Sequence, residues 1–218
     1  MIGEYQEDLA KVDAVRAPFE TQIKSMSVAE VLADDGLSGY AVASARVLFG
    51  DYCAGCHGAG GQGGPGFPVL ADDDWLYGGS IETILQTITN GRRGMMIAHG
   101  SMLSAAEINT LAQHAVDLSQ GNTSDAGAQL YRDKGCFGCH GADGKGLQIL
   151  GSANLTDAVW RFNDADKLAG AVKTITHGVN DPRDPNTRTA EMPAFGKRLS
   201  DSELKKLAIY AYKLGGGQ

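Results

Sequence analysis

Two short motifs constrain this chain more than any other feature. Each is a Cys-X-X-Cys pair followed directly by a histidine, and together they use all four cysteines: Cys53, Cys56 and His57, then Cys136, Cys139 and His140. This spacing is typical of covalent attachment of a c-type haem. Two thiols add to the porphyrin vinyl groups, and the next residue presents its imidazole to the iron. The motifs therefore predict two covalently bound haem c groups, with the cysteines as attachment points and the histidines as proximal iron ligands.

Three other uses of paired cysteines compete with this interpretation. A structural disulfide framework would leave the two histidines unexplained. A zinc site built from two such pairs usually has about 15–20 residues between the pairs, whereas 79 residues separate Cys56 from Cys136. A thioredoxin-like dithiol belongs to a βαβ pattern, which the sequence does not show. Haem attachment is the interpretation that uses every residue of both motifs.

The composition indicates a soluble globular protein. Hydrophobic residues make up 43% of the 218 residues, and no stretch approaches the ~20 apolar residues that span a bilayer. The net charge is −7, which argues against nucleic-acid binding. The negative charge lies in residues 1–120, where it either maintains solubility or attracts a basic partner. In the second case we expect a basic cytochrome c to dock near Asp72, Asp73 and Asp74.

The chain contains an internal repeat that extends beyond the two motifs. The matching strings are 87–91 with 174–178, and 103–108 with 199–204. Small polar residues at 119–124 indicate a linker. The predicted divisions are a lead-in segment 1–40, a first domain 41–120 and a second domain 121–218. We expect an all-α fold of two tandem class I cytochrome c-like haem domains with an N-terminal helical lead-in.

Local signals place the helices of each unit. A helix leads into each motif, and Asp125 is the expected N-cap of the second one. Helices are also expected over 80–90 and 164–176, each closed by a following glycine. The last helix of each unit begins at a Ser-X-X-Glu capping box, which starts at Ser104 and at Ser200.

The lead-in segment has weaker signals. Residues 5–17 are compatible with a helix, and Pro18 is expected to end it. Residues 27–33 are expected to form a short helical turn. We expect this segment to pack on one of the haem units.

A low-spin electron carrier needs a sixth iron ligand, and methionine raises the potential relative to a second histidine. Met192 is the candidate in the second unit, whereas Met95, Met96 and Met102 compete in the first. Aligning the units places Met96 opposite Met192. The sequence therefore predicts Met96 with His57 on the iron of haem 1, and Met192 with His140 on the iron of haem 2.

The first unit departs from the second near its methionine. Ile97 stands where the second unit has Pro193, and His99 stands opposite Phe195. The missing proline leaves this loop less rigid. His99 could then compete for the iron, or stay in solvent or hydrogen-bond a haem propionate. The two remaining histidines are expected to be structural: His114 and His177.

Residues 49–79 resemble the dihaem subunit of cbb3-type cytochrome c oxidases, which are bacterial proton-pumping terminal oxidases. The stretch around Trp75 carries a more specific resemblance than the haem motif alone, and the similarity extends through 154–157 and 214–217. The resemblance implies that both haem domains lie on the periplasmic side of the bacterial inner membrane. It also implies a membrane anchor on the N-terminal side. Since this chain shows neither anchor nor signal peptide, we expect a shortened, soluble form that begins at an added Met1.

The resemblance also implies the electron path. The subunit would accept electrons from a cytochrome c or from the quinol:cytochrome c oxidoreductase. It would pass them to the monohaem subunit and then to the copper-haem centre of the catalytic subunit, where oxygen is reduced. The chain shows no acid–base or nucleophile constellation, so no catalytic residue is predicted and we expect no turnover by the chain alone. The alternatives are a free periplasmic dihaem carrier and a gas-binding haem sensor or haem enzyme.

Overall fold

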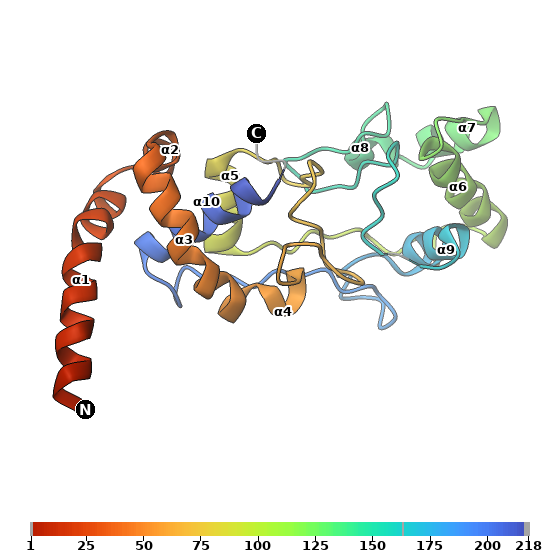
Figure 1. Cartoon of the computed structure of the whole chain (residues 1–218). Coiled ribbons are helices and arrows are strands. Elements are labelled where there is room, and N and C mark those ends of the chain that lie inside the picture. Colours follow the sequence, from red (N-terminus) through yellow and green to blue (C-terminus); the bar gives the residue numbers. More distant parts are fainter. Residues whose placement is uncertain (1, 163, 216–218) are drawn as a thin grey trace.

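The computed structural model describes residues 2–162 and 164–215, with side chains from residue 6 onward (Figure 1). In this part of the chain every regular element is a helix, and extended backbone occurs only as isolated bridges. The expected all-α fold class is confirmed. The helices are α1 Ile2–Ser25, α2 Val28–Ala33, α3 Asp35–Tyr52, α4 Ala54–His57, α5 Ile81–Asn90, α6 Ala105–Leu118, α7 Asp125–Asp133, α8 Phe137–His140, α9 Lys167–His177 and α10 Asp201–Leu214.

The helices gather in two groups at opposite ends of the molecule (Figure 1). We call α3, α5 and α10 the first lobe, on whose outer side α1 and α2 pack. We call α6, α7 and α9 the second lobe. Long loops that include α4 and α8 lie between the two groups. Both cysteine motifs therefore lie in the middle of the molecule.

The two lobes exchange the last helix of each sequence unit. Helix α10 ends the second unit but packs against α3 and α5 of the first, and α6 ends the first unit but packs against α7 and α9 of the second. The divisions 41–120 and 121–218 remain a prediction about the sequence repeat. The packing of the helices does not follow these divisions.

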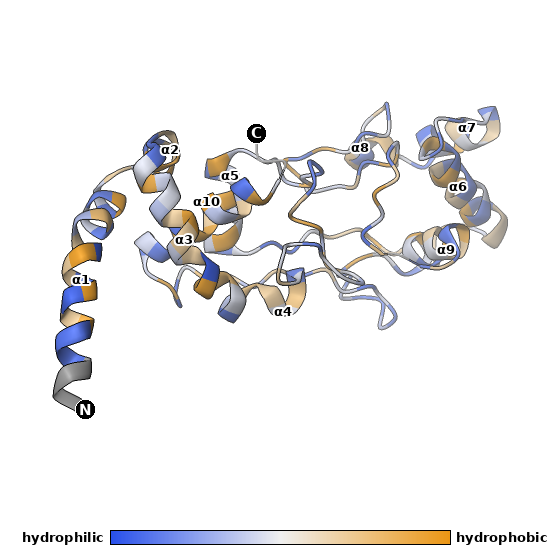
Figure 2. Cartoon of the chain, in the orientation of Figure 1, coloured by the Kyte–Doolittle hydropathy of each residue, from blue (hydrophilic) through white to orange (hydrophobic). Residues whose placement is uncertain are grey.

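The apolar core of the first lobe is the larger of the two. Figure 2 shows hydrophobic residues gathered where α3, α5 and α10 meet. The buried residues of this cluster include Ala41, Ala45, Phe49, Ile84, Leu207, Ala208 and Ile209. In the second lobe the buried side chains are fewer and include Ile108, Leu111, Ala112, Tyr131 and Ala171.

Buried lysines explain why α10 fits the first lobe. The Lys205 ammonium donates to the carbonyls of Ile23 (3.1 Å) and Met26 (2.7 Å), which lie at and just beyond the C-terminus of α1. Such a cation satisfies carbonyls that have no partner within the helix. The adjacent Lys206 pairs with Glu20 at 2.6 Å. The equivalent positions of α6 hold Asn109 and Thr110, which instead bond to carbonyls of their own helix.

The two lobes use different side chains where their helices cross. In the first lobe Phe49 of α3 meets Tyr210 of α10, with ring centroids 4.9 Å apart. In the second lobe Tyr131 of α7 meets His114 of α6 at 5.6 Å. Gly127 of α7 lies so close to α6 that a Cβ there would come within 2.7 Å of the His114 Cβ. The second crossing is therefore tight enough to require glycine.

The caps that the sequence predicts are largely present. Capping boxes start α6 at Ser104 and α10 at Ser200, and a third starts α2 at Ser27. The predicted N-cap Asp125 is wrong, because the side chain of Ser124 caps α7 instead. Helix α9 begins at Lys167 with Asp166 as its cap, later than expected.

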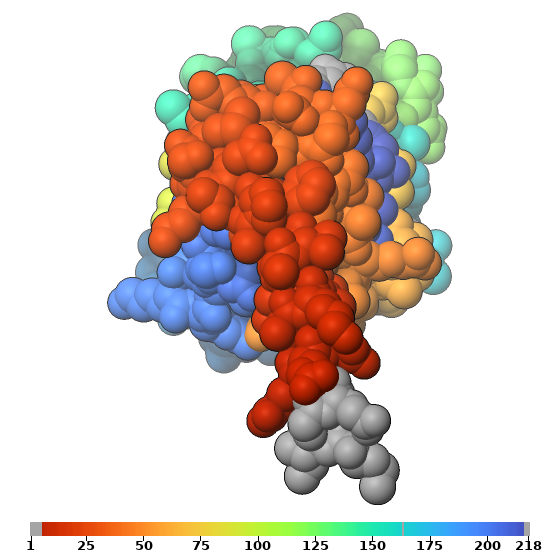
Figure 3. Space-filling view, turned by 60° about the vertical axis from the view of Figure 1, so that its left-hand side comes forward, coloured from red at the N-terminus to blue at the C-terminus, as the bar shows by residue number. Residues whose placement is uncertain are grey.

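The prediction that Pro18 ends the first helix is wrong, because α1 continues to Ser25. Tertiary contacts hold the residues after the proline. Phe19 stacks on Tyr40 of α3 with centroids 4.6 Å apart, and Ile23 is fully buried. Figure 3 shows α1, from residue 6 onward, lying across this end of the molecule. The lead-in packs on α3 of the first unit and also on α10 of the second, so it contacts helices of both units rather than of one.

Candidate haem sites

The first cysteine motif forms a single helical turn around α4. The backbone N–H groups of Cys56 and His57 both donate to the Cys53 carbonyl, at 3.1 and 2.9 Å. The His57 side chain is buried, and its Nδ1 lies 3.1 Å from the Pro68 carbonyl oxygen. Because a carbonyl only accepts hydrogen bonds, Nδ1 carries the proton and Nε2 keeps a lone pair for a metal ion.

The second motif repeats this arrangement around α8. The His140 N–H donates to the Cys136 carbonyl at 3.0 Å, and His140 Nδ1 lies 3.0 Å from the carbonyl oxygen of Ala153. Burial lowers the pKa of both motif histidines, His57 and His140. A lowered pKa favours the neutral imidazole, which is the form that can coordinate a metal ion.

The loops after the motifs also match. The N–H of Gly63 donates to the His57 carbonyl at 2.7 Å, and the N–H of Gly146 donates to the His140 carbonyl at 2.8 Å. The glycine that follows each histidine has a positive φ, +76° at Gly58 and +80° at Gly141. This conformation is easy only for glycine. Each chain can therefore turn back after the motif and bring a carbonyl to the imidazole.

The structure bears on the three other uses of paired cysteines, which are a disulfide framework, a zinc site and a redox-active dithiol. All four thiols are free, so no disulfide framework is present. Within the described residues no group of His, Cys, Asp and Glu is arranged to hold a metal ion by itself. Burial and the neighbouring Cys56 raise the pKa of Cys53 to about 11, whereas a redox-active dithiol needs a lowered pKa. Free thiols one helical turn from an oriented imidazole fit covalent haem attachment.

Apolar side chains also fit a haem plate. Large hydrophobic residues stay exposed in the loops after each motif and beside Met96, where a porphyrin could cover them. Ile149 is the extreme case, with 91% of its surface exposed. The exposed members of this group are Phe67, Ile97, Leu147, Ile149 and Leu150.

The methionine loops cross between the units. Met192 pairs its backbone with Arg92, just after α5, through N–H···O bonds of 2.8 and 3.0 Å. Met96 pairs in the same way with Val179, just after α9, through two bonds of 2.9 Å. The glycines at the helix ends allow this approach. A Cβ on Gly91 or Gly178 would collide with the carbonyl oxygen of the facing methionine.

This exchange differs from the pairing that the sequence predicts. Met192 and Cys53 both pack against the apolar cluster of the first lobe. The ring of Phe195, three residues after Met192, lies 6.3 Å from the ring of Tyr52, which directly precedes Cys53. His99, three residues after Met96, lies near enough to His140 for the two charges to interact. Met96 is half-buried, whereas Met95 and Met102 are 61% and 55% exposed. The structure thus favours Met96 over its two neighbours but brings it toward the second motif.

The remaining histidines are structural, as expected. The ring of His177 bonds to Asp184 at 2.9 Å. His114 is buried at the crossing of α6 and α7. Each of these histidines supports packing rather than a ligand position.

Near the first motif, sequence reasoning missed a side chain that joins the two units. Arg161 of the second unit is half-buried, and its Nε donates to the Gly66 carbonyl at 3.3 Å. Gly66 lies in the loop that carries Pro68, whose carbonyl holds His57. Leu76 occupies the equivalent position of the first unit, and no local pattern marks Arg161 as a contact.

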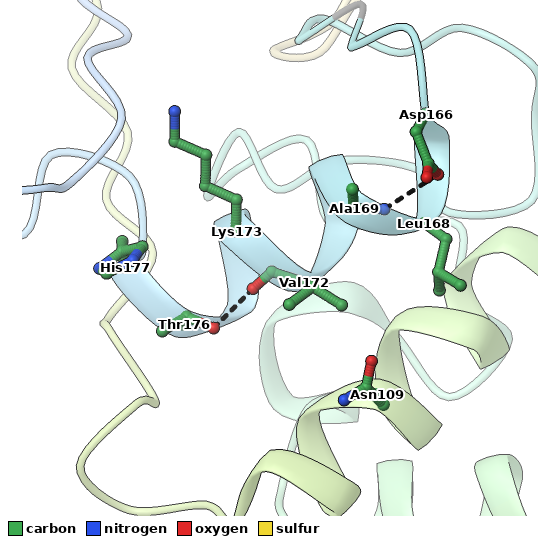
Figure 4. A pocket seen from close by; sticks show the side chains of 8 residues that line it. All are labelled: Asn109, Asp166, Leu168, Ala169, Val172, Lys173, Thr176 and His177. Carbon is green, nitrogen blue, oxygen red and sulfur yellow. Dashed lines mark hydrogen bonds between the residues drawn. The ribbon is translucent and has the colours of Figure 1, made fainter.

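One surface pocket is lined by residues outside both motifs. Figure 4 shows it between α6 and α9. Its lining residues are Asn109, Asp166, Leu168, Ala169, Val172, Lys173, Thr176 and His177. None of them is a cysteine or a methionine, so this pocket does not belong to the haem sites. Among the described residues no helix is both long and apolar enough to cross a membrane.

Comparisons with known proteins identify the family. The sequence model of the family "Cytochrome C oxidase, cbb3-type, subunit III" matches residues 41–114 and 122–210, one stretch per repeat. The cbb3-type cytochrome c oxidase subunit FixP of Azorhizobium caulinodans is 41% identical, over 97% of this chain and 73% of its own length. FixP of Bradyrhizobium sp. (strain ORS 278) is 37% identical, over 97% and 74%. Subunit CcoP of Azospirillum sp. (strain B510) is 37% identical, over 99% and 76%. The chain belongs to the family of cbb3-type cytochrome c oxidase subunit III.

Proposed function

We propose that this chain is the dihaem electron-transfer subunit of a cbb3-type terminal oxidase and holds two covalently bound haem c groups. The observation that carries the proposal is the duplicated site. Each Cys-X-X-Cys-His turn is followed by a carbonyl that orients the histidine, and each methionine loop pairs its backbone with the segment after a helix of the opposite unit. Family membership supports an oxidase complex as the setting.

We assign the iron ligands with the methionines exchanged. Cys53 and Cys56 attach haem 1, and its iron binds His57 and Met192. The attachment points of haem 2 are Cys136 and Cys139, and its iron binds His140 and Met96. The crossed backbone pairs around the methionines support this assignment, which replaces the pairing within each unit that the repeat alone suggested.

The haem irons supply one-electron oxidation and reduction. The role of the chain is to keep their ligands in place in both oxidation states, since a small rearrangement favours fast electron transfer. The Pro68 and Ala153 carbonyls orient the two imidazoles. The exchange also means that each sequence unit supplies a methionine to the haem attached by the other unit, so neither unit completes its iron site alone.

The proposed partners follow from this role. Electrons enter from a donor cytochrome c or a quinol:cytochrome c oxidoreductase and leave to the monohaem and catalytic subunits of the oxidase, on the periplasmic side of the membrane. Asp72, Asp73 and Asp74 offer an acidic docking place for a basic donor. Burial raises the pKa of Asp74, and repulsion from Asp157, Asp72 and Asp73 raises it further. The chain by itself reduces no oxygen.

The test is to isolate the native protein from its own cells and ask what co-purifies. We expect covalent haem in the membrane fraction, two haems per chain, together with a copper-haem oxidase. A soluble dihaem protein without an oxidase would support a free carrier instead. Carbon monoxide binding by the reduced wild-type subunit, at either haem, would support a gas-binding site.

A further inference from the structure

The loop around Met96 lacks the constraint that its counterpart has. Pro193 directly follows Met192, and its ring fixes the backbone φ there. Ile97 follows Met96 and imposes no such restriction. The second unit, however, carries a longer segment between Gly178 and Met192 than the first carries between its equivalent residues. Part of this segment lies against the Met96 loop.

Asn180 makes the first side-chain contact between this segment and the Met96 loop. Its side-chain amide donates to the carbonyls of Gly94 (2.7 Å) and Ala190 (2.8 Å), and its Oδ1 accepts from the Ala190 N–H at 3.0 Å. Among the described residues it is the one non-glycine with a positive φ, +51°. That conformation is unfavourable for most side chains but is tolerated by asparagine. The backbone here is held where the amide can bridge the two loops.

Asp181 is the second contact. Its side chain is 1% exposed, and Oδ2 accepts the backbone N–H of Ala98 at 2.8 Å. The guanidinium of Arg183 bonds to both carboxylate oxygens, at 2.9 and 2.7 Å. The carboxylate can therefore stay charged while buried. A charged acceptor gives the Ala98 N–H a stronger partner than a neutral one would.

Together the two side chains anchor both sides of the methionine. Gly94 lies two residues before Met96, and Ala98 lies two residues after it. We propose that Asn180 and Asp181 are positioning residues that clamp the Met96 loop, in place of the missing proline, so that the methionine stays on the iron held by His140. This inference rests on the exchanged ligand assignment above. The clamp keeps both the nearby His99 and outside ligands off that iron.

The test uses the full-length dihaem protein and carbon monoxide as the probe. Asn180→Gly keeps the backbone conformation accessible and removes the amide bonds, and Asp181→Ala removes the acceptor. We expect each variant to raise the carbon monoxide-binding fraction of one ferrous haem by about ten- to hundredfold, the range expected for losing a buried or charged hydrogen bond. The sulfur-to-iron charge-transfer band of the ferric protein should weaken in parallel.

Asp184→Asn is the matched control. Asp184 lies in the same segment, but its carboxylate bonds to His177 and to the Asn186 N–H. The control should bind no more carbon monoxide than the parent, and circular dichroism should show equal helix content in all variants. An increase with the control equal to that of the other variants would overturn the clamp, since general loosening would then explain it.

Met96→Ala separates this inference from the ligand assignment. Met96→Ala is made together with His99→Ala, so that this histidine cannot take the vacant position. If the double variant fails to open a haem to carbon monoxide, the assignment of Met96 as a ligand is wrong. If it opens one haem while Asn180→Gly and Asp181→Ala behave like the control, the assignment stands and the clamp alone is overturned.

Discussion

The two methionine loops have the same backbone pattern but are held by different means. Met192 is followed by a proline, and the facing Gly91 closes against it. Met96 has no proline and is flanked by side-chain bonds from Asn180 and Asp181. The repeat thus conserves the path of the chain while the contacts that fix it differ. One loop is stiffened within its own sequence, whereas the other depends on the opposite unit.

The largest expected effect tests the exchange itself. Replacing Cys136 and Cys139 by alanine leaves the haem of the first motif alone. In that protein Met192→Ala should abolish the sulfur-to-iron charge-transfer band and allow carbon monoxide to bind, because the iron loses its sixth ligand. Met96→Ala should leave the spectrum unchanged. The opposite result would restore the pairing within each unit.

The next effect compares the two helix crossings. Gly127→Ala places a Cβ against His114, and overpacking of this kind costs about 1–3 kcal/mol of the free energy of unfolding. Ala45→Gly, at the equivalent position of α3, should cost about 1 kcal/mol through helix propensity. Denaturant unfolding of both holoproteins measures the difference. A stabilising Gly127→Ala would show that the second crossing has room to spare.

A smaller effect concerns the charge near the first motif. Arg161→Leu introduces the residue found at the equivalent Leu76. Loss of a half-buried positive charge favours the ferric state, so the potential of haem 1 should fall by on the order of tens of millivolts. Arg16→Leu, on the exposed α1, is the control and should shift neither potential. Redox titration of the two haems measures both potentials. An unchanged potential of haem 1 would show that Arg161 lies too far from its iron to affect it.

The smallest effect is a pH dependence of the second lobe. Bonds from Lys134 and from Ser104 lower the pKa of Glu107 to about 2, below its ordinary value near 4.5. A lowered carboxylate pKa stabilises the folded state above pH 4.5, and this contribution is lost as the pH falls toward 2. Glu107→Gln should flatten the decline of the melting temperature in that window. Because the Glu107–Lys134 pair is partly exposed, the change should be slight. If the melting temperature falls equally steeply with pH in both proteins, Glu107 does not contribute to the pH dependence.

Local chemistry made much of this molecule predictable. Each haem motif places its cysteines and its histidine within one helical turn, so its geometry depends only on residues close in sequence. The same holds for the capping boxes at Ser104 and Ser200. Such short-range signals do not depend on the rest of the fold. The prediction at Pro18 was wrong for the opposite reason, because distant contacts of Phe19 and Ile23 hold that helix together.

The sequence by itself determined the two haem motifs, the all-α class and the methionines that compete for iron. Only the tertiary structure decided which lobe receives each last helix and each methionine. Two similar units leave this choice open, because α6 and α10 present similar apolar faces to similar partners. Long-range contacts select one arrangement. Lys205 and Lys206 of α10 bind groups in the C-terminal part of α1 and just after it. Glu107 of α6 instead pairs with Lys134, just after α7, at 2.6 Å. Residues far apart in the chain make these contacts, so no local pattern could reveal them.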